Sequence, residues 1–413
     1  MKKLPALVLL SFVFGPLAGQ QIREERSVVN IGVPVRVFQG RNFISTLNLE
    51  DFEVLEDGIP QKLEAVYLVH QTAVERRDEL NRFEPPTGRH FYLLFEITEY
   101  VPKIGEALAD FAEHVLSPGD KLTVVTPLKT YRLRPKTLES QSKAQIAQQL
   151  INLLRNDTLI GSSDYLDQVE EVEEIAQTLA LALIAAKNAM LETNPAAAQI
   201  NPLLGRTENR PEDYLPQYIR ALSALQAYRL LDEERMLKFA SELKKEDTQK
   251  YVFVFYQKEF IPEVEPQLIQ PYLYTNLERP DLQEMAANLT FVLKQTNSYD
   301  MEAIKKAYAD ASIAIHFLFI TRPAKHAFGL TFKERSDDIY SAFKEMAVST
   351  GGFFEASNNP RELLKDAVDS AENYYLLYYA PLNRERDGRF RKITVRVKAG
   401  GYQVIHRQGY IAD

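Results

Sequence analysis

The apolar residues of this chain follow two patterns, and the change from one to the other divides the sequence. Over residues 27–69 apolar and polar positions alternate between turns, which is typical of strands with one buried face. From residue 91 onward, short apolar runs become almost continuous and are rich in β-branched and aromatic residues. These runs are FYLLFEI (91–97), KLTVVTP (121–127), YVFVFY (251–256) and IAIHFLFI (313–320). Such runs predict strands that are covered on both faces, as in a parallel sheet.

Helical patterns alternate with these runs, and their order predicts the architecture. The helical patterns cover residues 104–116, 301–310, 338–349 and 360–372. Alternating strands and helices predict a doubly wound, Rossmann-like α/β domain, which we place at residues 90–380. Between Leu138 and Glu246 the strand pattern disappears and helical periodicity replaces it. A crossover needs only about a dozen residues, so residues 138–246 are predicted to form a large helical insertion.

The two ends of the chain share the alternating pattern. Over residues 390–397 apolar residues alternate with basic or polar ones, as they do near the N-terminus. We predict that an N-terminal β-module, residues 27–73, and C-terminal strands, residues 381–413, pack together as one β-sandwich. Residues 74–89 are charged and contain Pro85-Pro86, so they are predicted to form a linker to the α/β domain.

Residues 1–19 have the composition of a secretory signal peptide. Lys2 and Lys3 precede an apolar stretch from Leu4 to Leu17, and small residues follow it. We therefore expect an exported protein, periplasmic or extracellular, that keeps no membrane span after cleavage. The chain contains no cysteine, which excludes disulfides, thiol chemistry and a bacterial lipid anchor.

Charge and motifs narrow the expected function to binding. The formal net charge of −8 argues against nucleic acid or an anionic membrane surface as the partner, because both require a basic footprint. The six histidines show no metal-binding spacing, and Gly-x-Ser-x-Gly, His-Glu-x-x-His and Gly-x-Gly-x-x-Gly motifs are absent. We therefore expect that the protein is not an enzyme, with a hydrolase of unrecognised site as an alternative.

Several stretches, taken in order, resemble one bacterial family. They are DFEVLEDGIPQKLEAVYL, YLLFEITEY, SPGDKLTVVTP, MAVSTGGFFEA, YYLLYYAP and GRFRKITVRVKAGGYQVIHRQGYIA. Through these stretches the chain is similar to the von Willebrand factor A-related (VWFA-related) proteins exported by Acidobacteria-type bacteria, although residues 138–246 lie outside the resemblance. The resemblance implies a noncatalytic VWFA-type domain that binds protein partners through a metal ion at the carboxyl ends of its strands.

The resemblance also assigns the metal-binding loops. The first loop of the family reads Asp-x-Ser-x-Ser, and Glu96, Thr98 and Tyr100 stand at its three positions in this chain. Magnesium requires near-octahedral oxygen ligands at about 2.0–2.1 Å, and a tyrosine oxygen lies too far along its side chain to supply one. The loop that carries Asp in the family reads Gln257-Lys258-Glu259 here. These departures predict a degenerate metal-ion-dependent adhesion site.

Two interpretations of Glu96 and Lys258 follow. In one, the ammonium group of Lys258 pairs with Glu96 and replaces the metal ion; in the other, both are unrelated solvated residues. The expected function is protein–protein interaction without a cofactor, with an unidentified partner bound through residues 138–246. The alternative is a divalent-cation-dependent adhesion domain in which Glu96 and Thr98 hold Mg²⁺ or Mn²⁺ weakly.

Overall fold

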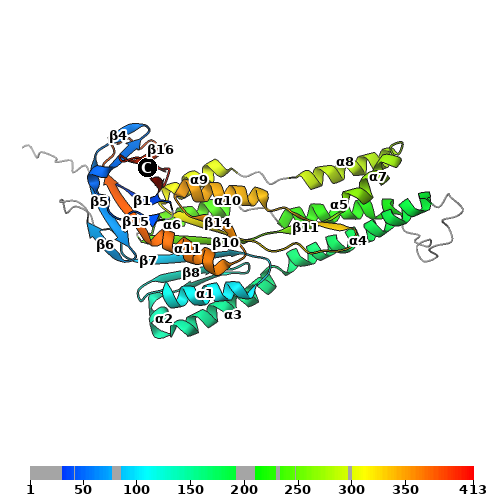
Figure 1. The fold of residues 1–413 in the computed structure, drawn as a ribbon, viewed down its shortest axis with the longest axis horizontal. Coiled ribbons are helices and arrows are strands. Elements are labelled where there is room, and N and C mark those ends of the chain that lie inside the picture. Colours follow the sequence, from blue (N-terminus) through cyan, green and yellow to red (C-terminus); the bar gives the residue numbers. More distant parts are fainter. Residues whose placement is uncertain are drawn as a thin grey trace, which may run out of the picture.

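The computed structural model describes residues 30–40, 42–76, 85–191, 210–228, 233–246, 248–295 and 300–413 (Figure 1). The predicted signal peptide, residues 1–19, lies outside the described residues, as does much of the predicted linker 74–89. Antiparallel sheets lie at one end of the molecule, an α/β sheet in the middle and a helical arm at the other end (Figure 1). No helix in the ranges given combines the length and the apolar composition that crossing a bilayer requires.

A six-stranded, mostly parallel sheet forms the middle of the molecule and confirms the α/β class. Its strands are β7 (Arg89–Glu96), β8 (Lys121–Val125), β9 (Thr130–Leu133), β10 (Gln249–Gln257), β12 (Ala314–Ile320) and β14 (Phe354–Ser357). Their order is β14-β12-β10-β7-β8-β9, and β9 runs antiparallel to β8 while the other pairs are parallel. Counted along the chain this is the doubly wound order 3-2-1-4-5-6, whose switch point lies between β7 and β10.

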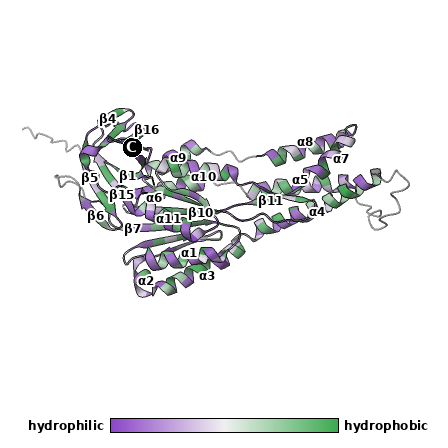
Figure 2. Ribbon diagram, in the orientation of Figure 1, coloured by the Kyte–Doolittle hydropathy of each residue, from purple (hydrophilic) through white to green (hydrophobic). Residues whose placement is uncertain are grey.

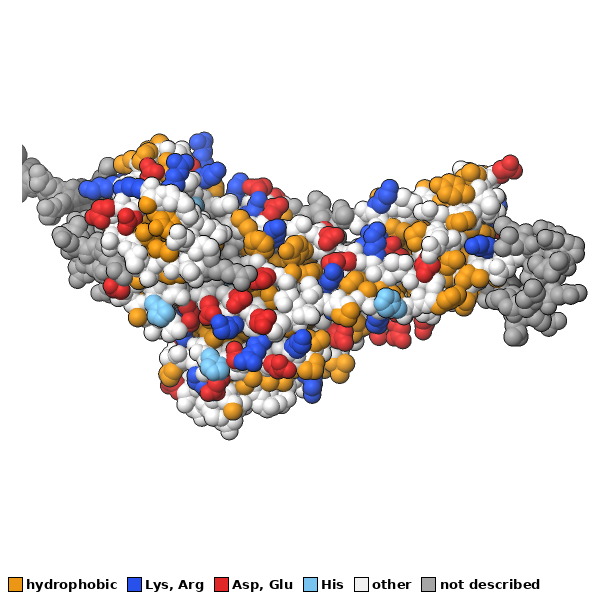
Figure 3. Space-filling model, viewed as in Figure 1, with side chains coloured by type: hydrophobic (Ala, Val, Ile, Leu, Met, Phe, Trp, Pro, Cys, Tyr) orange, Lys and Arg blue, Asp and Glu red, His pale blue; other side chains and the backbone are white. Residues whose placement is uncertain are grey.

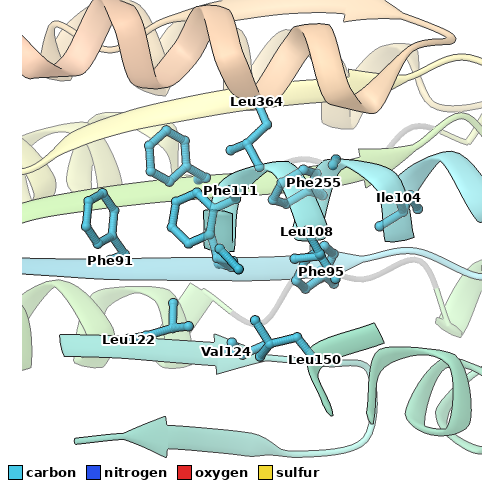
Figure 4. Close-up of a cluster of buried hydrophobic side chains, with 14 of the residues drawn as sticks. Phe91, Phe95, Ile104, Leu108, Phe111, Leu122, Val124, Leu150, Phe255 and Leu364 are labelled. Atoms are coloured by element: carbon cyan, nitrogen blue, oxygen red, sulfur yellow. The ribbon is translucent and has the colours of Figure 1, made fainter. Parts of the chain in front are cut away.

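Helices cover both faces of this sheet, because the side chains of the strands alternate between two separate cores. The first core lies under α1 (Pro102–His114), α3 (Lys143–Gly161) and α11 (Pro360–Glu372), with the short α2 (Pro135–Ser140) beside them. The second core lies under α6 (Glu233–Lys244), α9 (Met301–Asp310) and α10 (Asp337–Thr350). Figure 4 shows the aromatic side chains of β7 and β10 in the first core beneath α1. The covering helices carry both hydrophilic and hydrophobic residues, as expected for helices with one face in water (Figure 2).

A helical arm extends from the carboxyl edge of the sheet. It comprises α4 (Ser163–Leu191), α5 (Pro211–Tyr228), α7 (Pro266–Thr275), α8 (Pro280–Lys294) and the antiparallel strands β11 (Phe260–Val264) and β13 (Leu330–Glu334). These elements share a hydrophobic core of their own. The arm is rooted at the switch-point edge, since β11 follows β10 and β13 follows β12 along the chain.

The helices predicted over residues 138–246 are divided between the sheet and the arm. Leu150 and Leu154 of α3 and Leu243 of α6 are buried against the sheet, whereas α4 and α5 belong to the arm. Conversely, β11, α7, α8 and β13 lie outside this range and complete the arm. Helical periodicity identifies a buried face but not the element that covers it, which explains the difference.

Strands from the two ends of the chain pair with one another in antiparallel sheets. The first sheet holds β1 (Ile31–Gln39), β2 (Asn42–Phe43), β5 (Leu63–His70), β6 (Ala73–Arg76), β15 (Asn373–Tyr379) and β17 (Gln403–His406). The second holds β3 (Phe52–Glu56), β4 (Ile59–Gln61), β16 (Phe390–Val397) and β18 (Gly409–Ile411). Both contribute to one hydrophobic core. Because β15 lies in the first sheet, the α/β domain ends with α11, before the boundary expected at residue 380.

A buried ion network fixes the chain where α11 passes into β15. Arg89 donates to both carboxylate oxygens of Asp120, at 2.9 and 2.6 Å, and to Glu372 at 2.9 Å. Gln71 of the first terminal sheet donates to the other carboxylate oxygen of Glu372 at 3.0 Å. These charges are almost fully buried, so loss of one partner would leave an uncompensated charge. The network therefore ties the α/β domain to the terminal sheet.

His316 lies in β12 and is fully buried. Its Nδ1 accepts a hydrogen bond from the backbone N–H of Phe353 at 3.3 Å, so its Nε2 carries the proton of the neutral ring. Burial, together with the guanidinium of Arg36, lowers the pKa of His316 well below its ordinary value. Burial also lowers the pKa of His90 and of His406.

We predict that the free energy of unfolding decreases as the pH falls through about 6.5, because the unfolded chain then binds protons that the folded chain does not. Each such histidine contributes a slope of up to about 1.4 kcal/mol per pH unit. In His316→Asn, whose side-chain oxygen keeps an acceptor for Phe353, urea unfolding from about pH 5 to 7.5 should show a slope smaller by roughly that amount. If the unfolding free energies of His316→Asn and the wild type changed equally with pH, His316 would not be the source of the slope.

Candidate functional site

Two loops meet at the switch point of the sheet. Glu96 ends β7 and is in register with Tyr256, and Gln257 ends the neighbouring β10. After β7 the chain runs through residues 97–101 into α1. These are the loops to which the resemblance assigns the metal site, and open α/β sheets bind ligands at this position.

The carboxamide of Gln257 holds the first loop. Its Oε1 accepts hydrogen bonds from the backbone N–H groups of Thr98 at 3.1 Å and Glu99 at 2.9 Å, and from the Thr98 hydroxyl at 3.2 Å. Backbone N–H groups only donate, so the atom between them is the carboxamide oxygen. Gln257 is 2% exposed, and its Nε2 has no hydrogen-bond partner in the described part of the chain.

This arrangement does not fit a divalent cation. Two backbone N–H dipoles point at the centre of the loop, where Mg²⁺ or Mn²⁺ would require oxygen lone pairs. The hydroxyl of Thr98 already donates its hydrogen to Gln257. Over the described residues, no group of three or more His, Cys, Asp or Glu side chains is placed to hold a metal ion. The loop is therefore built around a neutral acceptor.

Glu96 lies on the opposite face of the sheet from Gln257. Because side chains alternate along a strand, Glu96 shares the face of Leu94 and Tyr256, which α6 covers. Glu96 is solvent-exposed, and desolvation by the surrounding protein raises the pKa of its carboxyl, although Arg235 of α6 acts to lower it. Glu96 and Thr98 therefore do not converge on one point, although they stand two residues apart in the sequence.

Tyr100 turns away from the loop towards α1 and α3. Gly105 of α1 makes room for it, because a side chain at this position would collide with the tyrosine hydroxyl. The guanidinium carbon of Arg155 in α3 lies over the ring, 5.2 Å from its centroid. Partial burial raises the pKa of Tyr100. The third position of the loop motif is thus used for packing.

Of the two interpretations of Glu96 and Lys258, the ion pair is not formed among the described residues. Lys258 pairs with Glu334 of β13, and its ammonium nitrogen lies over the ring of Phe260, 5.4 Å from the centroid. The chain enters β11 at Phe260, and this turn carries the Lys258 side chain to the base of the arm. The cation therefore stabilises the root of the arm.

A different cation links the two loops. Arg322 follows β12, and its guanidinium donates to the backbone carbonyl of Lys258 at 2.8 Å and to the carboxylate of Glu99 at 3.0 Å. Arg322 thus joins the loop after β10 to the loop after β7. Sequence reasoning missed this residue. The available signal was its position directly beyond the strand IAIHFLFI, which ends at the same edge of the sheet.

Comparisons with known proteins do not identify the chain. No family model matches it, and no curated protein matches it. Among solved structures, the human COPII-coat protein Sec24c is 9% identical with a TM-score of 0.29, over 92% of this chain and 51% of that one. The chain thus spans about half the length of that protein. A TM-score this low supports no conclusion about fold or function.

We predict that Gln257→Leu releases the loop. The variant replaces the carboxamide with an apolar group of similar size and so removes the acceptor. The N–H groups of Thr98 and Glu99 then lose their partner, which should lower the free energy of unfolding by about 1–3 kcal/mol. Amide hydrogen exchange at Thr98 and Glu99 should accelerate while exchange within β7 and β10 stays slow.

Gln257→Glu is the matched control, since it keeps an acceptor oxygen at the same point. Its exchange at Thr98 and Glu99 should stay close to that of the wild type. Unchanged protection of both amides in Gln257→Leu would show that the carboxamide does not hold the loop.

Proposed function

We propose that this chain is an exported, noncatalytic interaction protein whose arm recognises a protein partner without a metal ion. The observation that carries the proposal is the exposed apolar and acidic surface of the arm. The arm is mounted on an α/β domain that we propose to be of VWFA type, with a degenerate adhesion site. The paired terminal sheets are proposed to form a β-sandwich that supports it.

Two observations support the VWFA-type assignment. The loops that the resemblance assigns to the metal site, at Glu96–Tyr100 and at Gln257–Glu259, meet at the switch point of the sheet. At that point the Gln257 oxygen and the Arg322 guanidinium hold the loops together in the absence of a fitting metal-ligand set. The Gln257 oxygen, the Thr98 hydroxyl and the Arg322 guanidinium are engaged in hydrogen bonds within the fold, which favours a structural role for them over catalysis.

The arm carries large apolar side chains in water. Phe328, Phe291 and Tyr274 are 76%, 69% and 68% exposed, and all lie on the arm. Helix α8 has two apolar sides: Leu289 faces the core of the arm, whereas Phe291 lines a shallow hollow on its outer side. Figure 3 shows hydrophobic side chains gathered over this part of the molecule. Contiguous exposed apolar surface is typical of protein-interaction sites.

The first half of α4 adds a negative edge to the arm. Residues 164–177, DYLDQVEEVEEIAQ, contain six acidic side chains and no basic one. Glu170, Glu171 and Glu174 are exposed. A surface that combines apolar and acidic side chains is complementary to a partner with basic residues around an apolar patch. We therefore propose a basic protein as the partner.

Capture of partners from the native envelope fraction tests this proposal. We expect Tyr274→Ser/Phe291→Ser to reduce recovery of the principal partner about tenfold or more, since buried aromatic anchors dominate interface energies. Glu170→Lys/Glu174→Lys should weaken recovery as well. Raising the salt concentration from about 0.05 to 0.5 M should weaken binding by the wild type but not by the charge-reversed variant.

Leu382→Ser is the matched control, because Leu382 is 68% exposed but lies between β15 and β16, in the terminal part of the molecule. Point variants are preferable to deletion of residues 138–246, which would also remove α3 and α6 from the sheet. Equal recovery by wild type and arm variants, with a loss in Leu382→Ser, would place recognition on the terminal sheets and refute the proposal.

A further inference from the structure

A cavity of about 320 Å³ separates the first terminal sheet from the amino ends of β10 and β12, at the edge of the α/β sheet opposite the switch point. Its wall on one side consists of alternate residues of β1 and β15, including Arg36 and Tyr374, while their neighbours in sequence face the terminal core. Lys250, Tyr251 and Arg407 complete much of the wall. This volume is at the lower end of the range for small-molecule sites, about 300–1,000 Å³.

The two arginines in this wall are buried and lack a carboxylate partner among the described residues. Arg36 is 5% exposed and donates to the backbone carbonyl of Gly351. Arg407 is 6% exposed and donates to the carbonyls of Gly32 at 2.7 Å and Ala309 at 3.4 Å. Within the described residues, the Nε–H group of each side chain has no hydrogen-bond partner. Backbone carbonyls therefore hold the two guanidinium groups in place without using all of their donors.

The acidic side chains described near the cavity are engaged with groups other than the two arginines. Lys250 also lines the cavity, and its ammonium group donates to three backbone carbonyls. Glu246 also lines the cavity, but its two carboxylate oxygens accept from Tyr92 and bind His90. Asp310 acts on Arg407, but its carboxylate pairs with Lys244 at 2.7 Å and accepts from the Ile411 N–H at 2.8 Å.

A buried cation without a counter-charge is costly, since neutral carbonyls offset its lost hydration only in part. An isolated arginine would be more stable exposed to water. Two buried arginines that line one cavity are therefore best explained by an anion that supplies the missing charge. The guanidinium plane and its fixed donors are suited to carboxylate or phosphate oxygens.

We propose that this cavity binds a small organic anion through one carboxylate or phosphate group bound by the guanidinium groups of Arg36 and Arg407, which both line it. The rings of Tyr251 and Tyr374 cover the apolar part of the ligand. Because Arg36 and Arg407 belong to the terminal part of the chain and Tyr251 to the α/β domain, the ligand strengthens the contact between them. The site lies away from the arm and is independent of the function proposed for it.

Thermal unfolding with a panel of anions tests the proposal on the full chain. Succinate and citrate represent carboxylates, glycerol phosphate represents phosphate esters, and sodium chloride at equal ionic strength is the reference. We expect one of the two classes to raise the unfolding temperature by mass action. Calorimetry with the best anion should then give a single site whose affinity falls at least tenfold in Arg36→Gln and in Arg407→Gln.

Two further variants keep the test decisive if the arginine variants fold poorly. Ala314→Met fills the cavity from β12 without changing either arginine, so it should fold and lose anion binding. Arg391→Gln removes a buried arginine that pairs with Asp387 at 2.9 Å outside the cavity, so it should retain binding. The proposal is refuted if no anion exceeds the chloride reference, or if the effect survives Ala314→Met and both cavity arginine variants.

Discussion

One hydrogen-bonded group, the carboxamide of Gln257, holds the loops at the switch point in place. Its oxygen accepts from two backbone N–H groups and one hydroxyl of the neighbouring loop, and this fixes the path of the chain between β7 and α1. A metal ion at this position would require the opposite polarity, with oxygens pointing inward. The neutral side chain of Gln257 thus accepts the hydrogen bonds of the loop after β7. Arg322 then joins this loop to the loop after β10.

The same edge of the sheet carries the arm, so the two features depend on each other. β11 and β13 continue directly from the loops after β10 and β12, and ion pairs of Lys258 with Glu334 and of Arg335 with Glu263 join their bases. A loop that rearranged around a metal ion would move the root of the arm. Loops held by side chains give the arm a fixed base instead, as the proposed recognition by a preformed surface requires.

Sequence patterns predicted the α/β class and the positions of its main strands, because continuous apolar runs and helical periods are local properties. They did not divide the helices between sheet and arm, since α3 and α4 have similar periodicity but different neighbours. At the site, spacing placed Glu96 and Thr98 together, whereas the strand ends at Glu96 and its side chain lies on the other face. The pairing of Lys258 with Glu96, one of two interpretations, depends on loop position and charge, and neither of these indicates the turn into β11. From the sequence, Gln257 is only a position where the family carries Asp. Its role as an acceptor depends on backbone N–H groups of a loop that is distant in the sequence.

Manganese-induced relaxation of backbone amides tests most directly whether the Gln257 carboxamide, and not a cation, holds the loop. Mn²⁺ is added to isotope-labelled protein at about 1 mM, which matches the dissociation constant of the weakest protein sites for divalent ions. We expect the amide signals of Thr98 and Glu99 to broaden no more than those of buried residues in β7 and β10. Selective broadening of Thr98 and Glu99 in the wild type, abolished by Glu96→Ala, would show that the loop holds a cation and would contradict the role assigned to Gln257.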